Sequence, residues 1–261
     1  MSRPDPWQSL ATLTAARIAL GRAGNSLPTA AVLRFDVAHA LARDAVHQAL
    51  DVDGLATRWR EMGRVEPLVI HSRAVDRHTY LQRPDLGRCL DEASAAMLLA
   101  RRLPEAPDVA IVIADGLSAT AVHENALPLL GALLPLLDGL RIAPPVIARQ
   151  GRVALGDEVG AVLGARLVLV ILGERPGLSS PDSLGAYLTF APKIGRLDAE
   201  RNCLSNIRPA GLTPAAASVK LAWLIRAALA RQLTGIGLKD DSETLALPAE
   251  PAFSPCLKAE R

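Results

Sequence analysis

An unbroken apolar run at residues 167–172 constrains the fold of this chain more than any other stretch. The sequence GERPG follows it at residues 173–177, and its glycines and proline prevent the strand from continuing. A run of this kind is typical of a strand covered on both faces, as in a parallel sheet. Ligands of open α/β sheets bind outside the carboxyl ends of the strands, so Glu174 is a candidate ligand contact. The alternative is a solvated loop carboxylate paired with Arg175 or another neighbour.

Composition narrows the classes of function. The chain has 261 residues, of which 50% are hydrophobic, enough for one large domain or a main domain with a smaller one. Its formal charge of +2 and aromatic content of 3% do not favour nucleic acid as a partner. No apolar stretch approaches the roughly 18 to 20 residues of a membrane span, and no secretory signal is recognisable. We therefore expect a cytoplasmic protein without membrane contacts, whose cysteines, Cys89, Cys203 and Cys256, are reduced.

The first part of the chain, residues 1–104, is expected to be a mainly helical region that contacts a partner. Apolar spacing predicts a short helix near residues 12–20 and a stronger one from Thr29, which is a plausible N-cap. One short extended piece is expected at residues 68–71. The charged stretch at residues 72–88, which contains Pro84 and Gly87, favours a solvated surface loop.

Strands alternate with helices from residue 109 to residue 172, and this alternation predicts an α/β fold with a parallel, Rossmann-like sheet. The expected strands are residues 109–114, 142–148 and 167–172, and Pro144 with Pro145 places the second at an edge or a bulge. A further strand at residues 186–190 and a helix after Thr213 are expected. The Rossmann-like domain would then cover residues 105–240, followed by a loose tail at 241–261.

Local motifs do not identify a catalytic centre. Residues 116–120 read GLSAT, with Thr120 where a nucleophile elbow of the G-x-S-x-G type needs its second glycine. No G-x-G-x-x-G follows a strand, no P-loop is present, and the histidines lack metal-site spacing. Asp115, at another strand end, either caps the following helix or contacts a ligand. We assign no catalytic and no metal-binding residues.

Four blocks resemble the small subunit (light chain) of ethanolamine ammonia-lyase. They are DRHTYLQRPDLGR at 76–88, ADGLSATAV at 114–122, GRVALGDEVGAVLGARLVLVILGERPGLSSPDSLGAYLTFAPK at 151–193 and DAERNCLSNIRPAGL at 198–212. The resemblance, over about residues 15 to 237, implies an ammonia-lyase that uses adenosylcobalamin to convert ethanolamine to acetaldehyde and ammonia by radical chemistry. It also implies a hetero-oligomer with several copies of each subunit, in which a TIM-barrel large subunit holds the substrate and this chain helps to hold the cofactor. Some relatives carry an amino-terminal helix that targets a bacterial microcompartment, and the proline-containing opening MSRPDPWQSL leaves that localisation open.

The residues that contact cobalamin in this family fall on Val153 in GRV, Glu174 in GERPGL and Cys203 in RNCLSN. The strand pattern separately places Val153 and Glu174 after successive strands, on one carboxyl edge, with Cys203 expected in a facing loop. The D-x-H-x-x-G motif, whose histidine replaces the cofactor's benzimidazole on cobalt, is absent, since its nearest approach at residues 76–81 lacks the glycine. We therefore expect base-on binding, with this chain orienting a cofactor that performs the radical chemistry.

Two other classes of function stay open at this point. A self-sufficient Rossmann-like enzyme, such as a methyltransferase or hydrolase, is disfavoured by the missing phosphate loop and serine elbow. A non-catalytic assembly protein would use its helical first ninety residues as the interaction surface.

Overall fold

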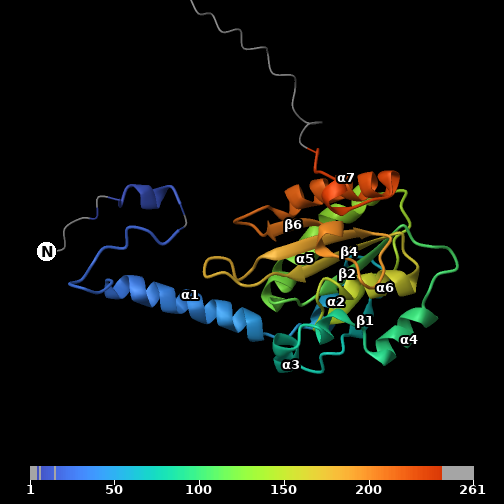
Figure 1. The fold of residues 1–261 in the computed structure, drawn as a ribbon, viewed down its shortest axis with the longest axis horizontal. Helices are drawn as coiled ribbons and strands as arrows, with labels where there is room; N and C mark the ends of the chain where they lie inside the picture. Colours follow the sequence, from blue (N-terminus) through green and yellow to red (C-terminus); the bar gives the residue numbers. More distant parts are fainter. Residues whose placement is uncertain (1–4, 6, 15, 243–261) are drawn as a thin grey trace, which may run out of the picture.

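The computed structural model describes residues 5, 7–14 and 16–242, which form a six-stranded sheet with helices on both faces (Figure 1). The strands lie in the order β1-β3-β2-β4-β5-β6. The first four in this order run parallel, β5 is antiparallel to β4, and β6 is antiparallel to β5. Their bounds are Leu68–His71, Val109–Ala114, Val146–Arg149, Leu167–Gly173, Leu184–Phe190 and Asn202–Ile207 for β1 to β6. The α/β class predicted from the sequence is confirmed.

The strands predicted at residues 109–114 and 167–172 are β2 and β4. They pair in parallel at the centre of the sheet, and every residue in them is buried. Successive side chains of a strand point to opposite faces of the sheet. Ile111 and Ile113 accordingly enter the core on one face, and Ala110 and Val112 enter the core on the other. Both faces are covered by helices, which explains why these strands read as unbroken apolar runs.

Helices α2 (Val52–Glu61), α5 (Ala119–Leu133) and α7 (Pro214–Arg231) cover one face of the sheet, and α4 (Glu92–Ala100) and α6 (Leu155–Leu163) cover the other. The helix predicted after Thr213 is confirmed as α7. The Thr213 hydroxyl caps it by accepting a hydrogen bond from the backbone N–H of Ala216 at 3.3 Å. The remaining helical elements are α1 (Thr29–His47), α3 (Arg77–Gln82) and the 3₁₀ turns Leu10–Thr12, Leu86–Arg88, Leu134–Leu137, Asp198–Glu200 and Gly235–Gly237.

Two details of the sheet differ from the prediction. The regular strand expected at residues 142–148 begins only at Val146, after both prolines, and lies between β1 and β2, so the edge position is wrong. The bulge alternative agrees with the pairing, because Ile142 bridges Val109 and Val146 pairs with Val112, which leaves one extra residue on the segment that contains the prolines. Because Pro144 and Pro145 precede the strand, they remove no hydrogen bond from it. Residues 202–207, expected as a loop, form β6, which pairs with β5, the strand that was predicted at residues 186–190.

Helix α1 confirms the helix predicted from Thr29, although Pro28 rather than Thr29 occupies its N-cap position. Figure 1 shows this helix extending sideways from the body of the molecule. Leu33, Val37 and Leu41 lie on one face of the helix and are 59%, 60% and 55% exposed. The described residues therefore leave most of this apolar face uncovered.

The short helix predicted near residues 12–20 is not present. Among the described residues of that range, only Thr12, the end of the first 3₁₀ turn, is helical. Ala19 has a φ of 53°, a left-handed conformation that interrupts a helix. The predicted tail at 241–261 lies outside the described residues beyond Ser242.

Residues 119–137 correct the expectation that no stretch is long enough for a membrane span. Helix α5 continues into a 3₁₀ turn, and together they give 19 helical residues. By length and composition alone, this stretch could cross a membrane. Leu129, Leu130 and Leu133 are nevertheless fully buried in the core between the sheet and α7. Asn125 on the same helix donates a hydrogen bond to the Asp182 carbonyl at 2.9 Å. These contacts are those of a core helix.

Candidate functional site

A cavity of 440 Å³ lies where the carboxyl ends of β2, β3 and β4 meet, and we call it the edge cavity. From β2 the chain passes to β3 on one side and then crosses to β4 on the other, so this edge is a topological switch point, where open α/β sheets bind ligands. The residues that line the edge cavity are Tyr80, Gly116, Leu117, Arg152, Val153, Leu172, Gly173, Glu174, Arg175 and Tyr187.

Two glycines allow the ends of β2 and β4 to approach closely beneath the edge cavity. The backbone N–H of Leu117 donates to the Gly173 carbonyl at 2.8 Å. A Cβ on Gly173 would lie 1.9 Å from the carbonyl oxygen of Ser118, and one on Gly116 would lie 2.2 Å from the Gly173 carbonyl oxygen. Both positions therefore require glycine, and these two residues contribute only backbone to the lining of the cavity.

Asp115 has a structural role, although not the helix cap that was one of its two predicted roles. Its carboxylate accepts hydrogen bonds from the backbone N–H groups of Gln150 and Gly151, both at 3.0 Å, and so joins the end of β2 to the turn after β3. Arg77 forms an ion pair with it at 3.4 Å and donates to the Gly116 carbonyl at 2.8 Å. Ser118 caps α5 instead, by accepting from Ala121 N–H.

Ser118 is not an available nucleophile, which removes the remaining support for a serine elbow. The residue is fully buried, and its hydroxyl donates a hydrogen bond to the Pro181 carbonyl at 2.7 Å. A hydrolytic serine must be exposed at the top of the sheet.

The stretch at residues 72–88 is not the solvated loop that its charge predicts. Asp76 accepts a hydrogen bond from Thr79 N–H at 2.8 Å and caps α3, which lies over the carboxyl edge. Tyr80 on α3 is fully buried, and its hydroxyl donates to the Gly151 carbonyl at 3.1 Å. Burial raises the pKa of the Tyr80 hydroxyl, which therefore stays protonated. This stretch thus forms one wall of the edge cavity.

Arg152 lies flat against Tyr80. Its guanidinium carbon is 4.2 Å from the ring centroid, and Nη2 donates to the Tyr80 carbonyl at 3.2 Å. A Cβ on Gly87 would lie 2.9 Å from Arg152 Cγ, so the glycine provides the space for this stacking. The Nε atom of Arg152 is buried without a hydrogen-bond partner among the described residues.

Glu174 follows the end of β4, and its two carboxylate oxygens differ in their hydrogen bonding. Oε2 accepts hydrogen bonds from the Ser183 hydroxyl at 2.5 Å and from the Asn206 backbone N–H at 3.2 Å. Oε1 lies beside Gly185, where a Cβ would be 3.0 Å away, and no hydrogen bond within the described part of the chain uses it. The carboxylate is therefore held in place by one oxygen while the other is an available acceptor.

Cys203 lies on β6 directly opposite Tyr187 on β5. Although the residue as a whole is exposed, the surroundings of its sulfur are partly desolvated. This desolvation, together with the negative charge of Glu174, raises the pKa of the Cys203 thiol. Cys203 is therefore a neutral thiol next to the edge cavity.

The three residues predicted from the sequence thus gather at one place. Val153 and Glu174 line the same cavity, and Cys203 contacts Tyr187, which lines it as well. The sequence placed Val153 and Glu174 correctly on one edge. It missed Tyr80, Arg152 and Tyr187, although all three lie in the blocks that carry the family resemblance.

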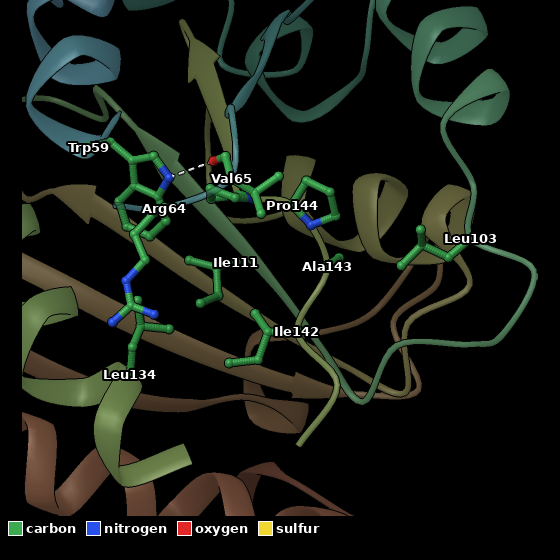
Figure 2. A pocket seen from close by; sticks show the side chains of 10 residues that line it. Trp59, Arg64, Val65, Leu103, Ile111, Leu134, Ile142, Ala143 and Pro144 are labelled. Carbon is green, nitrogen blue, oxygen red and sulfur yellow. Dashed lines mark hydrogen bonds between the residues drawn. The ribbon is translucent and has the colours of Figure 1, made fainter. Parts of the chain in front are cut away.

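A separate apolar cavity of 360 Å³ lies at the other end of the strands, near their amino ends (Figure 2). Its lining comes largely from segments that precede strands, such as Val65 before β1 and Pro144 before β3. Trp59 donates its indole N–H to the Val65 carbonyl at 2.8 Å across one wall. Arg64 is the one charged lining residue, and the residues predicted for cofactor contact all lie at the other edge.

Comparison with known proteins identifies the family of this chain. The family model for the ethanolamine ammonia-lyase light chain matches residues 4–239. Among curated proteins, the ethanolamine ammonia-lyase small subunit of Pseudomonas putida KT2440 is 56% identical over 95% of this chain and 92% of its own length. Those of Pseudomonas fluorescens Pf-5 and Pseudomonas syringae pv. tomato DC3000 are 52% and 51% identical, each over 94% of this chain and over 91% and 87% of their own lengths. The chain therefore belongs to the ethanolamine ammonia-lyase small-subunit (light-chain) family, a component of a lyase that acts together with a large subunit.

Proposed function

We propose that this chain is the subunit of ethanolamine ammonia-lyase that holds adenosylcobalamin, with the corrin ring lying across the edge cavity. The observation that carries the proposal is that Val153 and Glu174 line one cavity at the carboxyl edge of the sheet, while Cys203 lies on β6 opposite Tyr187, which lines the same cavity. Sequence resemblance and sheet topology select this same place independently.

The chemistry of the cavity suits a corrin, which is flat, largely apolar and fringed by amides. Glu174 Oε1 is an acceptor without a donor, and corrin amide N–H groups are donors. Val153 and Leu172 offer apolar contact, and the neutral thiol of Cys203 adds packing without charge. No histidine lines the edge cavity within the described residues, which supports base-on binding.

The proposed division of labour leaves the chain without a catalytic residue. Adenosylcobalamin, when bound, supplies the radical that converts ethanolamine to acetaldehyde and ammonia. This chain orients the cofactor, and the large subunit, proposed to be a TIM barrel, holds the substrate. The exposed apolar face of α1, formed by Leu33, Val37 and Leu41, is the proposed partner contact of the region 1–104 in an oligomer with several copies of each subunit. Microcompartment association remains a prediction.

The test combines this chain with the large subunit and follows cofactor binding by corrin absorption after gel filtration. The two-subunit complex is expected to retain adenosylcobalamin and to deaminate ethanolamine, whereas the isolated chain does not deaminate it. Glu174→Ala should leave the complex intact and weaken cofactor binding about tenfold, because the amide acceptor is lost. Glu61→Ala, an exposed carboxylate at the end of α2, is the matched control and should bind normally.

Three outcomes would contradict the proposal. They are a wild-type complex without corrin absorption, turnover by the isolated chain, and identical cofactor affinity in the Glu174→Ala and Glu61→Ala complexes. The last outcome would favour an assembly role without cofactor contact.

A further inference from the structure

A second cavity of 320 Å³ adjoins the edge cavity, and Arg152 and Val153 line both. We call it the arginine cavity, because its lining includes four arginines. They come from separate parts of the chain: the 3₁₀ turn after α3, the turn after β3, and the segment before β6. The complete lining is Pro84, Arg88, Arg152, Val153, Ala154, Arg196, Leu197, Asp198 and Arg201.

Two of these arginines are neutralised within the chain. Arg201 forms a bidentate pair with Asp157, with both N–O distances 2.6 Å, and Arg196 pairs with Glu200. Neither Arg88 nor Arg152 forms an ion pair within the described part of the chain. Asp198, which is fully exposed, is the one acid in the lining and lies 3.7 Å from Arg201 Nε. The cavity therefore carries uncompensated positive charge at Arg88 and Arg152.

Arg152 is held in position before any ligand arrives. It stacks on Tyr80, its backbone N–H donates to the Gly87 carbonyl at 2.8 Å, and its Nε is buried without an acceptor. A guanidinium that is fixed in this way offers its planar donors to a tetrahedral oxyanion at little entropic cost.

We propose that the arginine cavity binds a phosphate-type anion, and that this anion is the phosphodiester in the nucleotide tail of the bound cobalamin, with Arg88 and Arg152 as its ligands. The inference rests on the proposed function. Base-on cobalamin carries neutral amides around the corrin and a negative charge on the phosphodiester of its nucleotide tail. A corrin over the edge cavity has the arginine cavity directly beside it, since the two share Arg152 and Val153.

The test measures equilibrium binding of two cofactor forms to the complex with the large subunit. Adenosylcobalamin has the nucleotide tail, and adenosylcobinamide lacks it and hence lacks the phosphodiester. Arg88→Ala should weaken cobalamin binding about tenfold, or about 1.4 kcal/mol, and leave cobinamide binding unchanged. Arg83→Ala removes the same charge five positions away, outside the cavity, and should change neither. Arg152→Lys, which keeps the charge and loses the planar fork, should also weaken cobalamin selectively.

Equal weakening of both cofactor forms by Arg88→Ala, or no weakening of either, would overturn the inference. If the wild-type complex binds neither form, it is the proposed function that fails. If cobinamide binds too weakly to measure, salt dependence replaces it: cobalamin affinity should fall less steeply with salt in Arg88→Ala than in Arg83→Ala, and equal slopes would refute the contact. Inorganic phosphate should compete with cobalamin, and its binding without competition would indicate a separate site for free anions.

Discussion

The surroundings of Cys203 are those of a contact residue and not of a nucleophile. Reactive cysteines lie in electropositive surroundings that stabilise the thiolate. Cys203 instead lies beside Tyr187, where burial, and to a lesser degree the negative charge of Glu174, disfavour the thiolate and raise the pKa of the thiol. Its raised pKa agrees with a role in packing against a cofactor.

We expect Cys203 to be alkylated slowly by iodoacetamide near pH 8, because the raised pKa lowers the thiolate fraction at any given pH. The alkylation rate should rise as the pH increases beyond the ordinary pKa range of thiols, because the thiolate then forms. Glu174→Gln removes the neighbouring negative charge, so it should lower the thiol pKa and raise the rate at pH 8 by a factor of about two to five. Mass spectrometry of the Cys203 peptide measures the rate, with the Cys89 peptide as internal reference. An unchanged rate in Glu174→Gln would show that the carboxylate does not influence the thiol.

At the scale of elements, one buried ion pair joins α6 to the segment that enters β6. The Asp157 and Arg201 side chains are only 1% and 3% exposed, and Thr189 on β5 completes the contact by accepting from Arg201 Nη1 at 2.8 Å. The pair therefore connects α6 and β5 to the segment that contributes Arg201 to the arginine cavity. Removing one partner leaves the other charge buried and uncompensated.

Asp157→Ala should accordingly reduce the free energy of unfolding by about 3 to 5 kcal/mol. Urea denaturation followed by circular dichroism measures the loss. Asp85→Ala, which breaks an exposed pair with Arg83, is the control and should leave the midpoint almost unchanged. A double change to apolar residues, Asp157→Leu with Arg201→Met, should recover part of the stability. If Asp157→Ala and Asp85→Ala shifted the midpoint equally, the pair would not be a buried constraint.

The elements differ in how far the sequence could predict them. The strands at 109–114 and 167–173 were predictable because both faces are buried, so that hydrophobicity alone marks them. The strand β6 was not, because Cys203, Ser205 and Asn206 on it are exposed and its partner is defined only by long-range pairing. The edge position of Glu174 followed from the end of a strand. The Glu174–Ser183 and Tyr187–Cys203 contacts needed the antiparallel return of β5.

At the scale of the whole molecule, residues distant in sequence build the site. Strand β1 joins the sheet beside β3 and carries the following stretch, residues 72–88, over the carboxyl edge. Arg77 in that stretch donates to the Val46 carbonyl at 2.6 Å, in the last turn of α1, and also contacts Asp115. The helix that extends from the body is thereby connected to the edge of the sheet. Local patterns could not predict this arrangement, because charge alone made 72–88 resemble a solvated loop.

The same connection joins the end of the helix that carries the proposed partner surface to Asp115, at the end of β2. If α1 binds the large subunit, the double variant Val37→Asp with Leu41→Asp should weaken assembly at least about tenfold. Both residues are exposed in the chain alone, so the unfolding free energy of the isolated chain should change by no more than about 0.5 kcal/mol. Gel filtration of mixed subunits measures assembly, and urea denaturation measures stability.

Arg43→Asp, on a different face of α1 and 68% exposed at its side chain, is the control for introducing an acidic residue into this helix. It should assemble like the wild type, because the apolar stripe is intact. Equal loss of assembly in the control would point to overall charge rather than to the apolar face. Unchanged assembly in the double variant would place the large subunit elsewhere. A Leu41→Met variant should assemble like the wild type. That result would show that apolar contact, rather than the shape of one side chain, drives the association.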